Sequence, residues 1–151
     1  MVTIDICPAL DDNYMYLISD PVTKVAAVVD PVEPQKVLDK AKERGVEIQY
    51  VLTTHSHWDH AGGNEKIQKL CPSILHIYGG IGDGVKACTK EVGHGEILLV
   101  GKIKVTVLFT PCHTQGHVSY YFEKQNNLET PVVFTGDTLF SLGCGKIFEG
   151  T

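Results

Sequence analysis

The chain has 151 residues, of which 43% are hydrophobic and 21% charged, and its formal net charge is −5. This length and composition predict one globular domain over residues 1–151 and argue against a disordered chain. The negative charge and the lack of a basic run disfavour binding to nucleic acid or to an anionic membrane surface.

Membrane insertion and secretion are also disfavoured. No apolar run approaches the roughly 20 residues that a membrane helix needs, and the first residues lack the basic and apolar regions of a secretory signal. The five cysteines are an odd number without a C-x-x-C pair, which indicates free thiols in a reducing compartment. We therefore expect a cytoplasmic monomer, with a mitochondrial form left open.

The first part of the chain is predicted to form strands and one helix. Hydrophobic runs separated by Pro, Asp and Asn predict strands over residues 2–7, 14–19 and 25–30. A helix is predicted over about 34–44, because a proline suits its first position and a glycine follows its last.

The rest of the chain is predicted to be mostly strands. A short buried strand over 48–54 precedes a helix over 62–71. Further strands are predicted over residues 74–79, 96–101, 102–110, 118–123 and 132–136. Helices that alternate with strands, followed by strand after strand, predict a layered α/β domain with one mixed sheet or two.

The stretch "HSHWDH" (55–60) has the most unusual composition of the chain, with three histidines and one aspartate in six positions. Residues spaced by two in an extended segment point to one side. His55, His57 and Asp59 are therefore expected to face together, while His60 turns into the following helix. Imidazole nitrogens and carboxylate oxygens are ligands of zinc and similar divalent metals. A polar surface loop would explain any one of these histidines, but not their spacing.

Two further ligands are expected from other loops. His113 in "HTQGH" and Asp137 in "TGDT" each lie just past a predicted strand, where sites tend to be built. Because one metal needs fewer ligands than this set offers, we predict two ions with Asp137 as a bridge. His55 and His57 would bind the first ion, and Asp59 and His60 would bind the second ion. The candidate ligands are therefore His55, His57, Asp59, His60, His113 and Asp137.

Four neighbouring residues are expected to support the site. His117 is predicted to orient the loop of His113, with direct ligation as the alternative. Trp58 is predicted to pack beneath the site. Gly62 and Gly63 are predicted to let the next helix begin close to the sheet.

The motifs "THSHWDH", "HTQGH" and "TGDT" resemble the signature of the metallo-β-lactamase fold superfamily. Longer stretches resemble the glyoxalase II (hydroxyacylglutathione hydrolase) family over nearly the whole chain; they are "CPALDDNYMYLISD", "VDPVEPQKVLD", "VLTTHSHWDHAGGN", "TPCHTQGHVSYY" and "FTGDTLFSLGCGKIFEGT". The resemblance implies an αββα sandwich with a dinuclear metal site at the sheet ends.

The resemblance also implies a ligand set, metals and a reaction. His113 would join the first metal together with the first two cluster histidines, and zinc, iron or manganese would occupy the site. The reaction would be hydrolysis of S-lactoylglutathione and related 2-hydroxyacyl thioesters by a metal-bound hydroxide, which Asp59 and Asp137 would help to hold. This chemistry would serve methylglyoxal detoxification.

The segment "GCGKIFEGT" resembles the loop of that family that contacts glutathione. Lys146 would meet a carboxylate of the substrate, and Phe148 would stand where some members carry a tyrosine. The family continues past residue 151 to one more metal-binding histidine and a helical domain. Because these are not in the sequence, the sandwich is expected to be incomplete at its C-terminal end.

Three alternatives stay open. A shortened, non-catalytic metal-binding form is the first. A glutathione persulfide dioxygenase of the same superfamily, with a single iron, is the second, but the resemblance would then predict a cysteine at the position of His117. A nuclease is the third, and the acidic balance of the chain argues against it.

Overall fold

The computed structural model describes residues 2–124 and 128–150, which form two β-sheets and three α-helices. The first sheet has six strands, paired in chain order. They are β1 (Thr3–Ala9), β2 (Asn13–Ser19), β3 (Val25–Val29), β4 (Glu47–Leu52), β5 (His76–Gly80) and β6 (Lys90–Val92). The pairings of β1 with β2 and of β2 with β3 are antiparallel, and the other three are parallel.

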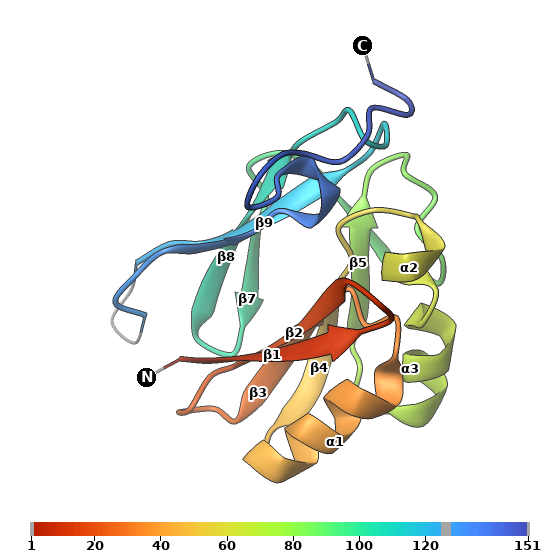
Figure 1. Cartoon of the computed structure of the whole chain (residues 1–151). Coiled ribbons are helices and arrows are strands. Elements are labelled where there is room, and N and C mark those ends of the chain that lie inside the picture. Colours follow the sequence, from red (N-terminus) through yellow and green to blue (C-terminus); the bar gives the residue numbers. More distant parts are fainter. Residues whose placement is uncertain (1, 125–127, 151) are drawn as a thin grey trace.

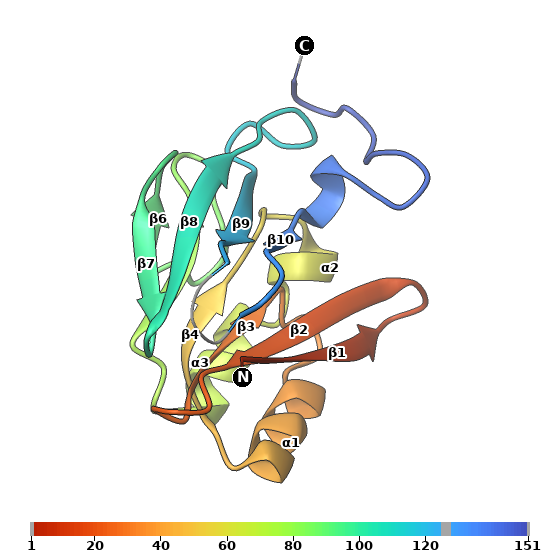
Figure 2. The same ribbon diagram turned by 90° about the vertical axis from the view of Figure 1, so that its left-hand side faces the viewer.

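The second sheet has four strands and is antiparallel throughout. In spatial order its strands are β10 (Val132–Phe134), β9 (Val118–Phe122), β8 (Ile103–Phe109) and β7 (Ile97–Val100). Figures 1 and 2 show this sheet on the side of the six-stranded sheet that faces away from α1.

The helices α1 (Pro34–Arg44), α2 (Trp58–Ala61) and α3 (Asn64–Leu70) lie along the six-stranded sheet (Figure 1). The first of them ends where Gly45 adopts a left-handed φ of 62°. There the N–H groups of Gly45 and Val46 donate to the carbonyls of Lys42 and Ala41, which pairs carbonyls that the helix leaves free. None of the helices in the described ranges has the length and apolar character needed to cross a membrane.

The core consists of two apolar layers, one on each face of the six-stranded sheet. Ala27 and Val29 of β3 pack toward the second sheet, while Ala26 and Val28 pack toward the helices. All four are at most 1% exposed. A strand that is buried on both faces has an uninterrupted apolar sequence, as "VAAVV" does.

The predicted α/β fold with two sheets is confirmed, and every predicted strand and helix is present with small shifts at its ends. Strand β6 and the separate helix α2 were not predicted. Strand β6 has the sequence "KEV", which is too short and too charged to show a hydrophobic pattern. In the described part of the chain, the helices cover only one outer face. The outer face of the four-stranded sheet carries exposed apolar side chains, among them Ile97, Leu99 and Val133.

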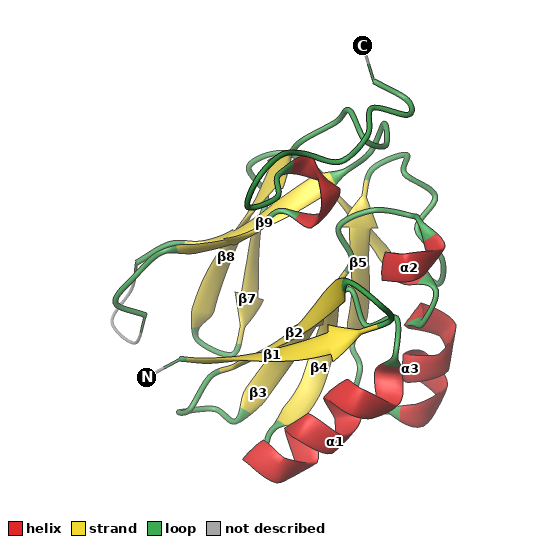
Figure 3. Cartoon of the chain, in the orientation of Figure 1, coloured by secondary structure: helices red, strands yellow, loops and turns green. Residues whose placement is uncertain are grey.

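The segments after β4, β8 and β10 meet at one end of the sandwich (Figure 3). They are residues 53–57, residues 110–117 and the 3₁₀ helix Gly136–Thr138. These segments contain most of the predicted site.

Candidate metal centre

All of the predicted metal ligands lie at this end of the sandwich. His55 and His57 follow β4, while Asp59 and His60 lie in the single turn of α2. His113 lies in the loop between β8 and β9, and Asp137 lies in the 3₁₀ helix after β10. The fold therefore brings three separate segments to one place.

The side chains form two groups of three metal-ligand atoms, each within 4.8 Å of the others in its group. His55, His57 and His113 form one group, and His55, His60 and Asp137 form the other. Asp59 lies beside the second group, with its Oδ2 atom 3.4 Å from Nε2 of His60.

The carboxylate of Asp137 faces both groups. Its Oδ1 atom lies 3.1 Å from Nε2 of His60, and its Oδ2 atom lies 3.3 Å from Nε2 of His113. Burial raises the pKa of Asp137, but the hydrogen bond with His60 and the neighbouring histidines lower it by more. An ionised carboxylate whose two oxygens point at different donor groups has the arrangement needed to bridge two ions.

The hydrogen bonds of Thr54 show which ring nitrogen of His55 carries the proton. Thr54 Oγ1 donates to Asp30 Oδ2 at 2.8 Å, so Nδ1–H of His55 must be the donor in its 3.0 Å contact with Thr54 Oγ1. Its Nε2 atom is left with a lone pair and has no hydrogen-bond partner among the described residues. The side chain is fully buried, and this burial lowers the pKa of His55 far below its ordinary value. A buried, neutral and unpaired nitrogen is suited to a metal ion.

His60 is held by the same aspartate. Its Nδ1 atom lies 2.9 Å from Asp30 Oδ2, and Asp30 Oδ1 also accepts the N–H of Thr54 at 2.8 Å. Burial disfavours the charged ring, but Asp30 and Asp137 raise the pKa of His60 to about 10. Asp30 adopts a left-handed φ of 47°, a sparsely populated conformation that is concentrated at functional sites.

His113 is oriented by the main chain of a distant segment. Its Nδ1 atom donates to the carbonyl oxygen of Lys146 at 2.7 Å, while its Nε2 atom lies 3.0 Å from Nδ1 of His57. A Cβ atom at Gly145 would lie only 2.9 Å from His113 Nδ1. The absence of a side chain at this glycine therefore lets the segment approach the ring.

These residues fit divalent metal ions. Three rings, those of His55, His60 and His113, have their Nδ1 atoms on fixed acceptors and direct Nε2 into the cluster. Nitrogen and carboxylate oxygen donors suit zinc and similar metals, and acceptors behind the rings are typical of metal-binding histidines.

His117 supports the cluster from behind, in agreement with the prediction. Its ring is fully buried and stacks on that of His55, with centroids 4.9 Å apart. Its Nε2 atom accepts the N–H of Asp137 at 3.2 Å, and its Nδ1 atom lies 2.9 Å from Thr110 Oγ1. Burial lowers the pKa of His117 to about 4, so the ring is neutral and can accept this hydrogen bond.

Comparison with known families agrees with this geometry. The family described as Metallo-beta-lactamase superfamily matches residues 10–149, which include every ligand candidate. The chain belongs to the metallo-beta-lactamase superfamily. Together with the histidine cluster, membership of this superfamily indicates that the chain binds divalent metal.

Individual curated relatives are similar to this chain over most of its length. "Hydroxyacylglutathione hydrolase cytoplasmic" from Arabidopsis thaliana is 57% identical over 145 residues, which are 95% of this chain and 55% of the relative. "Hydroxyacylglutathione hydrolase-like protein" from Gallus gallus is 43% identical, over 98% of this chain and 52% of the relative. The chain thus spans about half the length of these curated relatives.

A solved structure shows the same fold. The crystal structure of ETHE1 from Myxococcus xanthus has a TM-score of 0.79 and 28% sequence identity, covering 97% of this chain and 61% of that one. The match supports the metallo-beta-lactamase fold over nearly all of the present chain.

Lys146 and Phe148 lie at the rim of the cluster of candidate metal ligands. The ring centroid of Phe148 lies 5.2 Å from that of His113 and 5.6 Å from that of His57. The Lys146 ammonium lies 5.1 Å from the Phe148 centroid, within reach of a cation–π contact. Both side chains are exposed, so they can meet a ligand that enters from solvent.

The prediction for Trp58 was wrong. This side chain is 70% exposed and does not pack beneath the metal cluster. It begins the single turn of α2, whose buried residues are His60 and Ala61. Because a helix of one turn buries one side only, the first residue of α2 faces solvent.

Asp30 and Asn13 support the candidate ligands but were not predicted from the sequence. Asp30 has the contacts described above, and the side-chain amide of Asn13 donates to the Oδ2 atom of Asp59 at 3.1 Å and to its carbonyl at 3.2 Å. Both lie at strand ends next to turn residues, where Asp and Asn are common. Their position in the sequence therefore carries no signal of a metal site.

An open cavity of about 980 Å³ borders the cluster of candidate metal ligands. Its lining includes Asp59, His60 and Asp137 on one side, with Tyr16 and Phe140 among the aromatic residues. This volume lies within the range of small-molecule sites.

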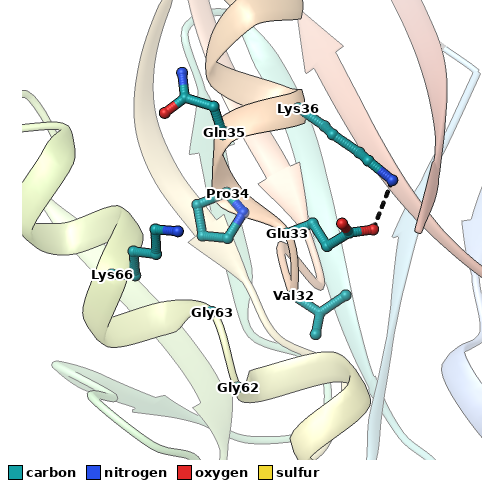
Figure 4. A pocket seen from close by; sticks show the side chains of 8 residues that line it. All are labelled: Val32, Glu33, Pro34, Gln35, Lys36, Gly62, Gly63 and Lys66. Carbon is teal, nitrogen blue, oxygen red and sulfur yellow. Dashed lines mark hydrogen bonds and ion pairs between the residues drawn. The ribbon is translucent and has the colours of Figure 1, made fainter. Parts of the chain in front are cut away.

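A second hollow, of about 210 Å³, lies away from the metal cluster at the start of α1 (Figure 4). The Glu33–Lys36 ion pair (2.6 Å) stands on one side and the Gly62–Gly63 pair on the other. A Cβ atom at Gly63 would collide with the carbonyl of Pro31. The glycine therefore allows a close approach, as predicted, but to the segment after β3.

Proposed function

We propose that this chain is the metal-binding catalytic domain of a hydrolase that cleaves S-lactoylglutathione and related 2-hydroxyacyl thioesters of glutathione. The products would be the free 2-hydroxy acid and glutathione. The names of the Arabidopsis and chicken relatives support this substrate class. The observation that carries the proposal is Asp137, whose two carboxylate oxygens face two separate donor groups.

The proposed site holds two divalent ions. Both are proposed to be zinc, with iron or manganese as the alternatives. His55, His57 and His113 would hold the first, Asp59 and His60 the second, and Asp137 both. When bound, such ions would act as Lewis acids toward the thioester carbonyl and would lower the pKa of water to near neutrality.

The residues of this chain have defined parts in the proposed reaction. Asp30 and Thr54 keep protons on the outer nitrogens of His60 and His55. The inner nitrogen of His55 is free for metal, whereas that of His60, paired with Asp137, would give up its proton when metal binds. Asp59, steadied by the amide of Asn13, and Asp137 would accept hydrogen bonds from the attacking water. Because a thiolate is a good leaving group, no general acid is needed.

The acyl part of the substrate would lie beside the cluster at the edge of the open cavity, and the glutathione part would lie across Lys146 and Phe148, which do not line that cavity. Its carboxylates would approach the Lys146 ammonium, and the apolar part of the glutathione chain would pass the ring of Phe148. A charge-assisted contact at an exposed site adds modest affinity, so Lys146 would affect KM more than kcat. We further propose that the protein acts in the cytoplasm, in line with the name of the Arabidopsis relative, and that it is a monomer.

The test is metal content by elemental analysis, combined with the rate of S-lactoylglutathione hydrolysis by the same preparation. We expect about two ions per chain and turnover that stops when a chelator removes them. Lys146→Ala should raise KM and leave kcat nearly unchanged. Lys124→Ala, which removes a lysine outside the site, is the matched control.

Two results would contradict the proposal in different ways. Metal binding without turnover would make the chain a non-catalytic metal-binding form. One iron per chain, with oxygen consumption on glutathione persulfide, would indicate a dioxygenase in place of the hydrolase.

A further inference from the structure

Asp83 lies outside the metal cluster, in the loop that joins β5 to β6. The glycines on both sides of it adopt left-handed φ angles, 75° at Gly82 and 68° at Gly84. Glycine takes this conformation without a steric penalty. The next residue, Val85, is buried, and a Cβ atom at Gly79 would lie 2.7 Å from it. The "GDG" turn therefore presents Asp83 from a loop that is anchored in the core.

The carboxylate of Asp83 joins two loops that carry predicted metal ligands. Its Oδ2 atom accepts the N–H of Ser56 at 2.6 Å, and its Oδ1 atom accepts the N–H of Gly116 at 2.9 Å. Ser56 stands between His55 and His57, and Gly116 follows His113 by three positions. One side chain thus links the main chain on both sides of the His55–His57–His113 group.

The chain segments around this link are in close contact. A Cβ atom at Gly116 would lie 2.5 Å from Cβ of Asp83, and one at Gly80 would collide with the carbonyl of Gly116. Glycine at 116 therefore allows the loop to approach Asp83. The Asp83 carboxylate, which stands between the two ligand loops, and the direct bond from the N–H of Val118 to the carbonyl of Thr54 at 2.9 Å together fix the spacing of these loops.

We propose that Asp83 is a positioning residue that sets the distance between the two histidine-bearing loops and thereby the affinity and geometry of the metal site. This inference rests on the metal site of the proposed function. Asp83 belongs to neither group of candidate metal ligands. It acts through the main chain at Ser56 and Gly116.

The test compares Asp83→Asn with Glu91→Gln. An asparagine offers one acceptor oxygen and one donor amide, so it can satisfy only one of the two N–H groups. Glu91 is the matched control, because it accepts the N–H of Gly82 in the same loop at 3.0 Å and contacts neither ligand loop in the described structure. Both substitutions remove one negative charge.

Three quantities are measured for each chain: Zn²⁺ affinity by competition with a chelator, the visible absorption of the Co²⁺-loaded protein, and the thermal midpoint of the metal-free protein. D83N is expected to lower Zn²⁺ affinity about 10–100-fold, the range for residues that orient metal ligands, and to change the Co²⁺ spectrum. E91Q should leave both unchanged. D83E keeps two acceptor oxygens and should lose less affinity than D83N.

The outcomes separate this inference from the proposed function. A wild-type chain that binds no metal would overturn the proposed function. Wild-type binding with unchanged affinity and spectrum in D83N would overturn only the role of Asp83, even if its thermal midpoint falls. If D83N does not fold, Gly116→Ala replaces it, because a Cβ atom there would lie 2.5 Å from Cβ of Asp83 and push the loop away from the carboxylate. Wild-type affinity and spectrum in that variant would also reject the inference.

Discussion

The two ends of the sandwich use the same device, an aspartate that ties loops together through main-chain N–H groups. At the end away from the metal cluster, Asp20 follows β2 and accepts the N–H groups of Val22 at 2.9 Å and Lys102 at 2.8 Å. At the cluster end, Asp83 accepts those of Ser56 and Gly116. In both cases one carboxylate joins a segment of the six-stranded sheet to a segment of the four-stranded sheet.

Each aspartate also has a glycine pressed against it. A Cβ atom at Gly101 would lie 2.6 Å from Asp20 Oδ2, and one at Gly116 would lie 2.5 Å from Asp83 Cβ. The difference lies in what the joined loops carry. Residues 20–24 and 101–102 contain no histidine, whereas the loops joined by Asp83 contain three predicted ligands. One structural device can therefore serve stability at one end of the sandwich and the predicted metal site at the other.

Removing a ligand at the cluster end should have the largest effect. His55→Ala deletes the nitrogen that both donor groups share, so the chain should lose bound metal. Its S-lactoylglutathione hydrolysis should fall by more than the roughly 100-fold seen when residues behind a ligand are changed. Elemental analysis and initial rates measure this.

His76→Ala is the control for that change, because His76 begins β5 and belongs to neither donor group. Equal loss of metal in both variants would show that the two donor groups do not define the site.

The two glycines provide a matched pair for the comparison between the ends. Gly116→Ala and Gly101→Ala should each destabilise the fold by about 1–3 kcal/mol through overpacking, with some added strain at Gly101 because its φ is 58°. Only Gly116→Ala should also weaken Zn²⁺ binding. Denaturant unfolding and chelator competition measure the two effects, and weaker Zn²⁺ binding in Gly101→Ala would break the comparison.

Asp20→Asn is expected to affect the stability of the fold but not the binding of metal. Asp20 is 1% exposed and, besides its two main-chain contacts, accepts the hydroxyl of Thr23 at 2.8 Å. Asparagine leaves at least one of these donors unpaired, at a cost of about 1–3 kcal/mol in the free energy of unfolding. Zn²⁺ affinity should match that of the wild type. A change in affinity of the size expected for D83N would mean that both ends serve the site.

The smallest expected effect is the pH dependence of the stability difference between the wild type and Asp20→Asn. Burial raises the pKa of Asp20, but the hydrogen bonds from Lys102, Val22 and Thr23 lower it by more, so the folded-state pKa lies below the unfolded value. The stabilisation is therefore present above the unfolded pKa and is lost as pH falls through the folded one. The thermal midpoints of metal-free wild type and Asp20→Asn should converge below about pH 4. A gap of constant size would contradict the assignment.

Much of the architecture could be predicted from the sequence because it depends on short-range patterns. The run "VAAVV" predicts a buried strand, and Gly45 predicts the end of α1. Strand β6 was not predicted, because a three-residue strand forms through pairing with β5 and not through its own hydrophobic pattern. Trp58 was misplaced because exposure of an aromatic side chain depends on which side of a one-turn helix meets the core.

The donor chemistry of this protein follows from a short stretch of its sequence. The spacing of His55, His57, Asp59 and His60 along six residues is local, and only metal binding explains it well. How those donors are held depends on contacts between distant segments of the fold. The contacts of Asp30, Asp83 and the Lys146 carbonyl join residues that are 24 to 33 positions apart, and any aspartate or carbonyl has the same hydrogen-bonding capacity. Chain folding, not residue type, selects which of them meets a ligand loop.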